Sequence, residues 1–359
     1  MRCSGQAARQ ARTPISIVAA LLVWFPSAAV FGAPPALTPR TFVDLVNTQR
    51  AVVVGINVSM STDTQSRLPK DHPVIPAPQL NDVPADPSPS VGTGLLIDTT
   101  GLILTNNHVL EQAEQITVTL WKGDRFDAVI VGRDPKADLA LIRLAPRTGQ
   151  PTTFPAAKLG DSDASEVGEW VAAIGNPFGL DQTLTVGILS GKGRALGNSP
   201  YEEYLQTDAS INPGSSGGPL FNIAGEVIGL TTAINPSGQG IGFAIPINQI
   251  KLLLPQLQQG KVRRGWIGVM IQNPAPTPPV DDGRVTGVLI TDVMEDSPAA
   301  QAGLMRGDLV LEFDGAPMAH VRDLPRRVAT TAIGKRVTVK LLRHSTPMSV
   351  TVTVGELKD

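Results

Sequence analysis

The sequence predicts a mainly β protein in which two small barrels of short strands are followed by a smaller α+β domain. Aromatic residues form only 4% of the 359 residues, whereas Gly (35) and Pro (31) are abundant, which is typical of short strands joined by many turns. Short apolar runs recur between residues 51 and 245, and from about Trp266 strand-like and helix-like segments alternate. This length is sufficient for about two or three domains.

Residues 1–33 have the features of an export signal. Arg2, Arg9 and Arg12 precede an apolar run over residues 15–33. A proline and small residues late in this run favour a cleaved signal peptide, whereas its length leaves a retained signal anchor open. Either alternative takes the rest of the chain across a membrane. We therefore expect an exported protein of a bacterial periplasm, free or anchored to the inner membrane.

Residues 41–258 are expected to form the two barrels, with a short helix over 41–47. The first six strands are expected at 51–58, 94–97, 102–105, 115–120, 127–132 and 139–144. The second six are expected at 170–174, 182–189, 204–207, 220–223, 227–233 and 242–245. Six short strands are enough to close one small barrel. A helix over 247–254, which Pro255 should end or kink, closes this region.

A segment rich in Pro, Asp and Ser, residues 59–91, interrupts the first barrel between its first two strands. A loop of this length is usually either functional or disordered. Both interpretations stay open.

The remaining residues, 264–356, are expected to form a separate α+β domain. Strands are expected at 266–271, 287–293, 308–313, 337–342 and 348–354. Ser297, Pro298 and Gly303 have the types expected at the N-cap, first turn and C-terminal end of a short helix. A second helix is expected at 323–330.

The chemistry-bearing stretch is Thr207–Leu220, where Ser216 lies among Gly214, Gly217 and Gly218. A serine hydroxyl is a weak nucleophile unless a neighbouring base takes its proton. Glycines allow a loop to direct successive N–H groups at one point, as stabilisation of an oxyanion requires. The candidate donors are the backbone N–H groups of Gly214 and Ser216, with Ser215 as a possible helper.

The sequence also supplies a base and a carboxylate upstream of the serine. His108 follows the strand at 102–105, and Asp138 precedes the strand at 139–144. The chain order His, Asp, Ser is that of the chymotrypsin-like barrel enzymes. Each residue alone is more often structural, but the three together predict acyl transfer by His108, Asp138 and Ser216.

Four sequence blocks together resemble the HtrA (Deg) family of serine proteases. They are Thr105–Val109, Asp138–Ile142, Gly175–Gly179 and Gly214–Pro219. Ser215 departs from the family, which usually has Asn there. The resemblance implies a chymotrypsin-like double six-stranded β-barrel, a regulatory loop at 59–91 and a homotrimer.

The same resemblance implies two binding sites. The substrate pocket would involve Ile211, Ile234 and Ile241, whose apolar side chains suit small or medium aliphatic residues. Residues 264–356 would form a single PDZ domain. Its carboxylate-binding loop would be Trp266, Ile267, Gly268 and Val269, which would hold the C-terminus of a peptide.

Composition narrows the remaining functions. A net charge of −2 does not favour nucleic acid as a partner. No H-E-x-x-H motif is present, so no metal or cofactor is implied. We expect an exported serine endopeptidase that acts on unfolded proteins. The alternatives are a PDZ-dependent chaperone or scaffold with secondary proteolysis, and a membrane-anchored stress-sensing protease with one dedicated substrate.

Overall fold

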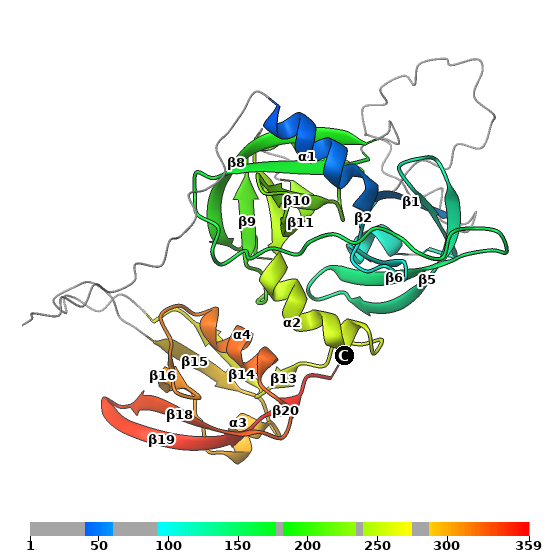
Figure 1. Ribbon diagram of the computed structural model, residues 1–359. Helices are drawn as coiled ribbons and strands as arrows, with labels where there is room; N and C mark the ends of the chain where they lie inside the picture. The colour runs from blue at the N-terminus through cyan, green and yellow to red at the C-terminus, as the bar shows by residue number, and fades with distance from the viewer. Residues whose placement is uncertain are drawn as a thin grey trace, which may run out of the picture. The chain divides into compact units, whose positions relative to one another are not determined.

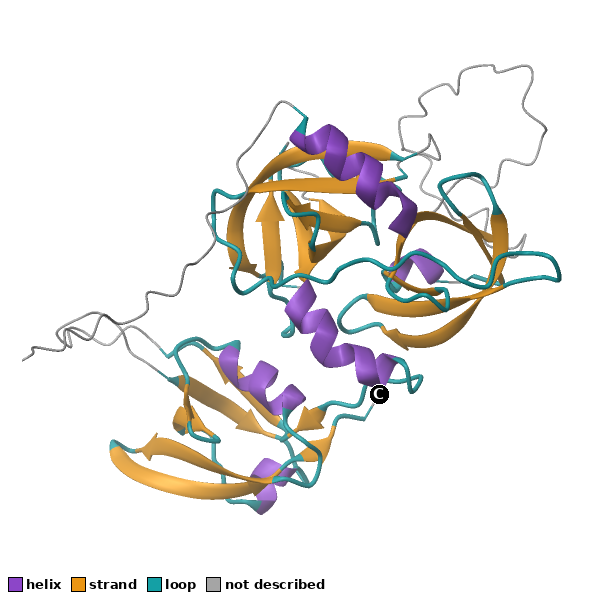
Figure 2. Ribbon diagram, in the orientation of Figure 1, coloured by secondary structure: helices purple, strands orange, loops and turns teal. Residues whose placement is uncertain are grey.

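The computed structural model describes residues 40–59, 92–111, 113–176, 182–197, 199–234, 240–274 and 287–358, without the side chains of residues 233 and 234. These ranges form two closed six-stranded barrels and a following α+β domain (Figures 1 and 2). The predicted fold class is confirmed. The predicted export segment 1–33 and all but the first residue of the segment 59–91 lie outside the described residues.

The first barrel has the strand order β1-β2-β3-β6-β5-β4. It follows a helix, α1 (Thr41–Gln49), and a 3₁₀ turn (Arg50–Val52). Its strands are β1 (Val53–Ser59), β2 (Gly92–Leu96), β3 (Leu102–Thr105), β4 (Gln115–Thr119), β5 (Arg125–Asp134) and β6 (Leu139–Ala145). Neighbouring strands are antiparallel, as in β2–β3, β3–β6 and β5–β6. The end of β3 and the start of β6 therefore lie at the same rim of the barrel, where loops can carry functional residues.

The second barrel has the strand order β10-β11-β12-β9-β8-β7. Its strands are β7 (Trp170–Gly175), β8 (Thr183–Arg194), β9 (Tyr204–Thr207), β10 (Pro219–Asn222), β11 (Val227–Ile234) and β12 (Gly242–Pro246). Helix α2 (Ile247–Leu257) follows. This helix continues through Pro255 instead of ending there, and the N–H of Gln258 still reaches the carbonyl of Leu254. A proline close to a helix end disturbs few hydrogen bonds.

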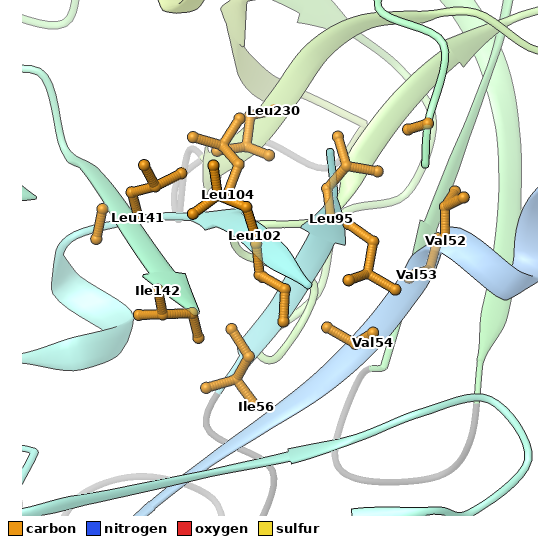
Figure 3. Packing of buried hydrophobic residues seen from close by; sticks show 14 of the residues in the cluster. Val52, Val53, Val54, Ile56, Leu95, Leu102, Leu104, Leu141, Ile142 and Leu230 are labelled. Atoms are coloured by element: carbon orange, nitrogen blue, oxygen red, sulfur yellow. The ribbon is translucent and has the colours of Figure 1, made fainter. Parts of the chain in front are cut away.

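One hydrophobic cluster contains residues of both barrels and joins them into a single scaffold. Figure 3 shows Val54, Leu95, Leu104 and Leu141 of the first barrel in one cluster with Leu230 of β11. Phe221 and Ile245 of the second barrel belong to the same cluster. Such close packing resists relative movement of the elements that it joins. Loops from both barrels are thereby held in a fixed relation.

The C-terminal domain has its own core and a six-stranded sheet. Its elements are β13 (Gly265–Trp266), β14 (Val269–Gln272), β15 (Val288–Val293), α3 (Pro298–Gln301), β16 (Leu309–Phe313), β17 (Ala316–Pro317), α4 (Asp323–Thr330), β18 (Arg336–Arg343), β19 (Thr346–Thr353) and β20 (Gly355–Glu356). The Ser297 hydroxyl caps α3 by accepting the N–H of Ala300, as its sequence predicts. The core includes Ile290, Phe313 and Val339.

One strand prediction in this domain is wrong. Residues 266–271 do not form one strand, because β13 pairs with β20 and β14 pairs with β15. Gly268 separates them with φ of +78°, a conformation that glycine adopts without strain.

Among the described residues, no helix is long and apolar enough to span a membrane.

The shared core leads to a stability prediction. Leu141 is fully buried on β6, so Leu141→Ala should lower the free energy of unfolding by about 2–5 kcal/mol. Val129, 55% exposed in the same barrel, provides the matched control, and Val129→Ala should cost less than about 1 kcal/mol. Urea denaturation measures both. Equal effects of the two changes would contradict this packing.

Candidate active site

His108 and Asp138 meet at the rim of the first barrel. His108 begins a 3₁₀ turn after β3, and Asp138 ends the turn between β5 and β6. Nδ1 of His108 lies 2.8 Å from Oδ2 and 3.0 Å from Oδ1 of Asp138. A carboxylate at Nδ1 favours the tautomer whose Nε2 is free to accept a proton. The His108 side chain is 44% exposed, so a substrate can reach it.

The backbone around Asp138 is held in an unusual conformation. Its φ is +53°, which aspartate tolerates better than most residues. The side-chain amide of Asn106 donates to the Asp138 carbonyl at 2.9 Å. The backbone N–H of His108 donates to Asp138 Oδ1 at 3.0 Å. These contacts orient the carboxylate toward the imidazole before any substrate binds.

A fourth residue, Thr232 of β11, completes this group and was not identified from the sequence. Its hydroxyl donates to Asp138 Oδ2 with 2.5 Å between the oxygens. Its carbonyl oxygen accepts the Ser216 hydroxyl at 3.3 Å. Thr232 therefore contacts both the carboxylate and the nucleophile candidate. In sequence it is an ordinary β-branched strand residue, so no local signal marks it.

The structure places Ser216 on the second barrel, in the turn before β10. Ser216 and His108 are both described, and no hydrogen bond joins the Ser216 hydroxyl to His108. The hydroxyl donates to the Thr232 carbonyl instead. Contacts between a nucleophile and its base are often formed only when substrate binds. Rotation of the Ser216 side chain is the change that the chemistry requires.

The turn that carries Ser216 is held by its carbonyl groups. The Ser215 carbonyl accepts the Thr231 hydroxyl at 2.6 Å and the Gly218 N–H at 3.0 Å. A trans peptide directs its N–H opposite to its carbonyl, so these contacts fix the direction of the Ser216 N–H. The Ser215 N–H donates to Asn212 at 2.9 Å and is engaged inside the turn. The expected helper role of Ser215 therefore has no support here.

Two glycines are required by this turn. Gly214 and Gly217 have φ of +93° and +84°. A Cβ on Gly217 would lie 2.1 Å from the Thr93 carbonyl oxygen and 2.3 Å from the Thr105 hydroxyl. No other residue fits that space. The turn thus approaches β2 and β3 of the first barrel closely enough to bring Ser216 toward His108.

The predicted substrate pocket is only partly described. Ile211 is 8% exposed and packs against Gly242, where a Cβ would lie 2.6 Å from its Cγ1 atom. Ile241 is half-buried and adjacent to Gly242 in the chain. The side chain of Ile234 lies outside the described residues. Ile211 therefore packs against the start of β12, and the pocket itself stays a prediction.

The predicted carboxylate-binding loop, Trp266 to Val269, runs from the last residue of β13 to the first residue of β14. Ile267 is buried, and its carbonyl accepts the N–H of Ala299 at 2.8 Å. The Gly268 carbonyl accepts the N–H of Met294 at 2.9 Å. The N–H groups of Gly268 and Val269 consequently point away from these partners. The next strand, β14, is the edge strand of the described sheet, so its outer side is open to an added peptide strand.

Two six-stranded barrels with a Ser, His and Asp site divided between them define the class of trypsin-like serine peptidases. The trypsin-like peptidase domain family matches residues 92–230, and the PDZ domain family matches residues 265–354.

The described part of the chain holds no group of three or more His, Cys, Asp or Glu side chains that could bind a metal ion.

Comparisons with individual proteins narrow this class to a family. Probable periplasmic serine endoproteases (DegP-like) from Pseudomonas putida (strain W619) and Halomonas elongata are 42% and 44% identical over 276 and 277 residues. Each match covers 75% of this chain and 57% of the relative, so the chain spans little more than half of the length of these relatives.

Solved structures extend the likeness over nearly the whole of the compared chains. The HtrA-type protease AlgW with tripeptide has a TM-score of 0.74 at 34% identity, covering 89% of this chain and 98% of that one. A serine endoprotease from Yersinia pestis has a TM-score of 0.65 at 31% identity, covering 91% and 100%. The chain belongs to the HtrA-type serine proteases.

The position of Thr232 generates a prediction about activity. Thr232→Val removes the hydroxyl that donates to Asp138 but keeps the β-branched shape. A hydrogen bond to a charged group contributes about 1.5–3 kcal/mol, so kcat should fall about 10- to 100-fold with little change in KM. Steady-state hydrolysis of a fluorogenic peptide measures this effect. Thr232→Ser keeps the hydroxyl and should recover most of the rate; a fully active Val variant would refute the role.

Proposed function

We propose that the protein is an exported serine endopeptidase that degrades or processes unfolded proteins. The contact of His108 with Asp138, with Thr232 linking this pair to Ser216, carries the proposal. The names of the relatives, probable periplasmic serine endoproteases, support the same activity and compartment. Assembly into a homotrimer is a further prediction from the resemblance. Retention of a membrane anchor is the alternative that the length of the N-terminal apolar run leaves open.

The reaction begins when Ser216 Oγ attacks the carbonyl carbon of a peptide bond. His108 Nε2 takes the hydroxyl proton, and Asp138 stabilises the imidazolium that forms. The N–H groups of Gly214 and Ser216 bind the negative oxygen of the tetrahedral intermediate. His108 then gives the proton to the departing amine, which leaves an acyl-enzyme. Water, activated by His108, hydrolyses this ester and restores Ser216.

The orientation of Ser216 supports regulation of this reaction. Its hydroxyl donates to the Thr232 carbonyl, so the nucleophile must turn before it attacks. Binding of substrate, or of a peptide C-terminus at the PDZ domain, would favour the turned state only if it binds that state more tightly. We propose a resting enzyme in which the Ser216 hydroxyl turns from Thr232 toward His108 on ligand binding. The open edge of β14 supplies the ligand site.

The proposed chemistry is tested by β-casein cleavage. Ser216→Ala removes the nucleophile and should lower the rate by at least about 10³-fold, and Asp138→Asn should act similarly by favouring the wrong imidazole tautomer. Gel electrophoresis and mass spectrometry of the products give the rates and cleavage sites. Undiminished cleavage by pure Ser216→Ala protein would rule out this mechanism. Cleavage mainly after Lys or Arg would rule out the apolar pocket.

The proposed regulation is tested with short peptides that end in apolar residues. Such peptides should raise β-casein cleavage by the full chain, and the same peptides with an amidated C-terminus should not. Amidation removes the carboxylate that the N–H groups of Gly268 and Val269 would bind. The cleavage rate against peptide concentration gives the apparent affinity. Equal stimulation by free and amidated peptides would contradict a carboxylate-binding loop.

A further inference from the structure

Thr93 of β2 is fully buried and all of its polar atoms have partners. Its N–H donates to the Ser216 carbonyl at 2.8 Å. Its hydroxyl donates to the Gly214 carbonyl at 2.6 Å and accepts the Asn176 N–H at 2.9 Å. Its carbonyl accepts the Thr105 hydroxyl at 2.7 Å. Three separate segments near the site therefore converge on one residue.

The position of Thr93 explains why these contacts matter. Thr93 belongs to the first barrel, whereas Gly214 and Ser216 lie in the nucleophile turn of the second. Its partner Thr105 ends β3, three residues before His108. Asn176 directly follows β7. Thr93 therefore joins the strand that leads to the base with the turn that carries the nucleophile.

The contacts of Thr93 hold two peptide planes of that turn. The Gly214 carbonyl shares a plane with the Ser215 N–H, which donates to Asn212 at 2.9 Å. The Ser216 carbonyl shares a plane with the Gly217 N–H, which donates to Thr231 at 2.8 Å. Each plane is thus held at both ends. Together with the Ser215 carbonyl on Thr231, these contacts determine the backbone angles on both sides of Ser216.

We propose that Thr93 is a positioning residue, whose hydroxyl holds the peptide plane between Gly214 and Ser215 and thereby keeps the nucleophile turn in the conformation that binds the oxyanion. Its backbone N–H holds the Ser216 carbonyl in addition. This role rests on the proposed peptidase function. Only a hydroxyl can donate to the Gly214 carbonyl and accept from Asn176 at the same time. Serine shares this capacity and valine lacks it. The hydroxyl contacts backbone groups of Gly214 and Asn176 and not the side chain of Ser216 or His108.

The competing explanation is that Thr93 only fills space. Substitutions that remove either its methyl group or its hydroxyl distinguish this packing role from the positioning role. The Cγ2 methyl of Thr93 lies 3.3 Å from the position of a Cβ on Gly218, so it fills space beside the turn. Thr93→Val keeps this methyl and replaces only the hydroxyl with a second methyl. Thr93→Ser keeps the hydroxyl and removes the methyl. A packing role predicts that Ser is the more harmful change, and a positioning role predicts that Val is.

The test compares both variants in hydrolysis of a fluorogenic peptide by the full chain. Thr93→Val should lower kcat about 10- to 100-fold with KM within about threefold, because displacement of catalytic groups by about 1 Å can cost 10²-fold. Thr93→Ser should recover kcat to within about threefold of the parent. A Val variant within twofold of the parent, or equal losses in Val and Ser, would overturn the proposal.

Ser162→Ala provides the matched control. Ser162 is also buried, and its hydroxyl accepts the N–H of Asn248 at the start of α2, so the change removes a similar hydrogen bond outside the site. Its kcat should stay within twofold of the parent. If Thr93→Val does not fold, Thr93→Cys replaces it, since a thiol is a weak donor and acceptor.

A second readout is independent of activity. In the Ser216→Ala background, Thr93→Val should increase amide hydrogen exchange in residues 207–220, and Thr93→Ser should not. Absence of that increase would overturn the proposal even if the parent shows no proteolysis. Conversely, a parent without Ser216-dependent cleavage would reject the peptidase function and leave the exchange comparison to decide the role of Thr93.

Discussion

The hydrogen bond from Thr232 to Asp138 joins the two halves of the site across the barrels. Each barrel alone carries an incomplete set of groups: His108 and Asp138 on one, Ser216 and Thr232 on the other. Their relation depends on the shared core, in which residues of both barrels belong to one cluster. Because displacement of reacting groups by about 1 Å can cost 10²-fold in rate, rigid packing of the barrels is a condition of the chemistry.

Three threonine hydroxyls donate hydrogen bonds that hold the groups of the site in place. Thr93 and Thr231 donate to carbonyls of the nucleophile turn, and Thr232 donates to the carboxylate. A buried carbonyl without a partner is costly, so these hydroxyls both stabilise the turn and select its conformation. Glycines give the turn the freedom to adopt positive φ, and the threonines then restrict it. The site is consequently organised in advance, except for the hydroxyl of Ser216 itself.

The sequence was informative where chemistry and backbone leave local signals. The barrels followed from short β-branched runs, and the grouping of His108 with Asp138 followed from residue type, chain order and position at strand ends. Thr93 and Thr232 could not be found this way. A threonine inside a strand indicates only β propensity, and the sequence does not show which groups its hydroxyl contacts. The break at Gly268 was missed for a similar reason. Its positive φ depends on tertiary partners such as Met294, which no local pattern reveals.

The account is tested most directly by reaction of the intact chain with a fluorophosphonate, which modifies only an activated serine hydroxyl. Peptide mass spectrometry then locates the probe. The account predicts about one probe per chain, on Ser216, and at least about a 10³-fold slower reaction in His108→Ala, since the hydroxyl needs its base. A probe on another serine, or labelling of Ser216 at the same rate without His108, would contradict a nucleophile activated across the two barrels.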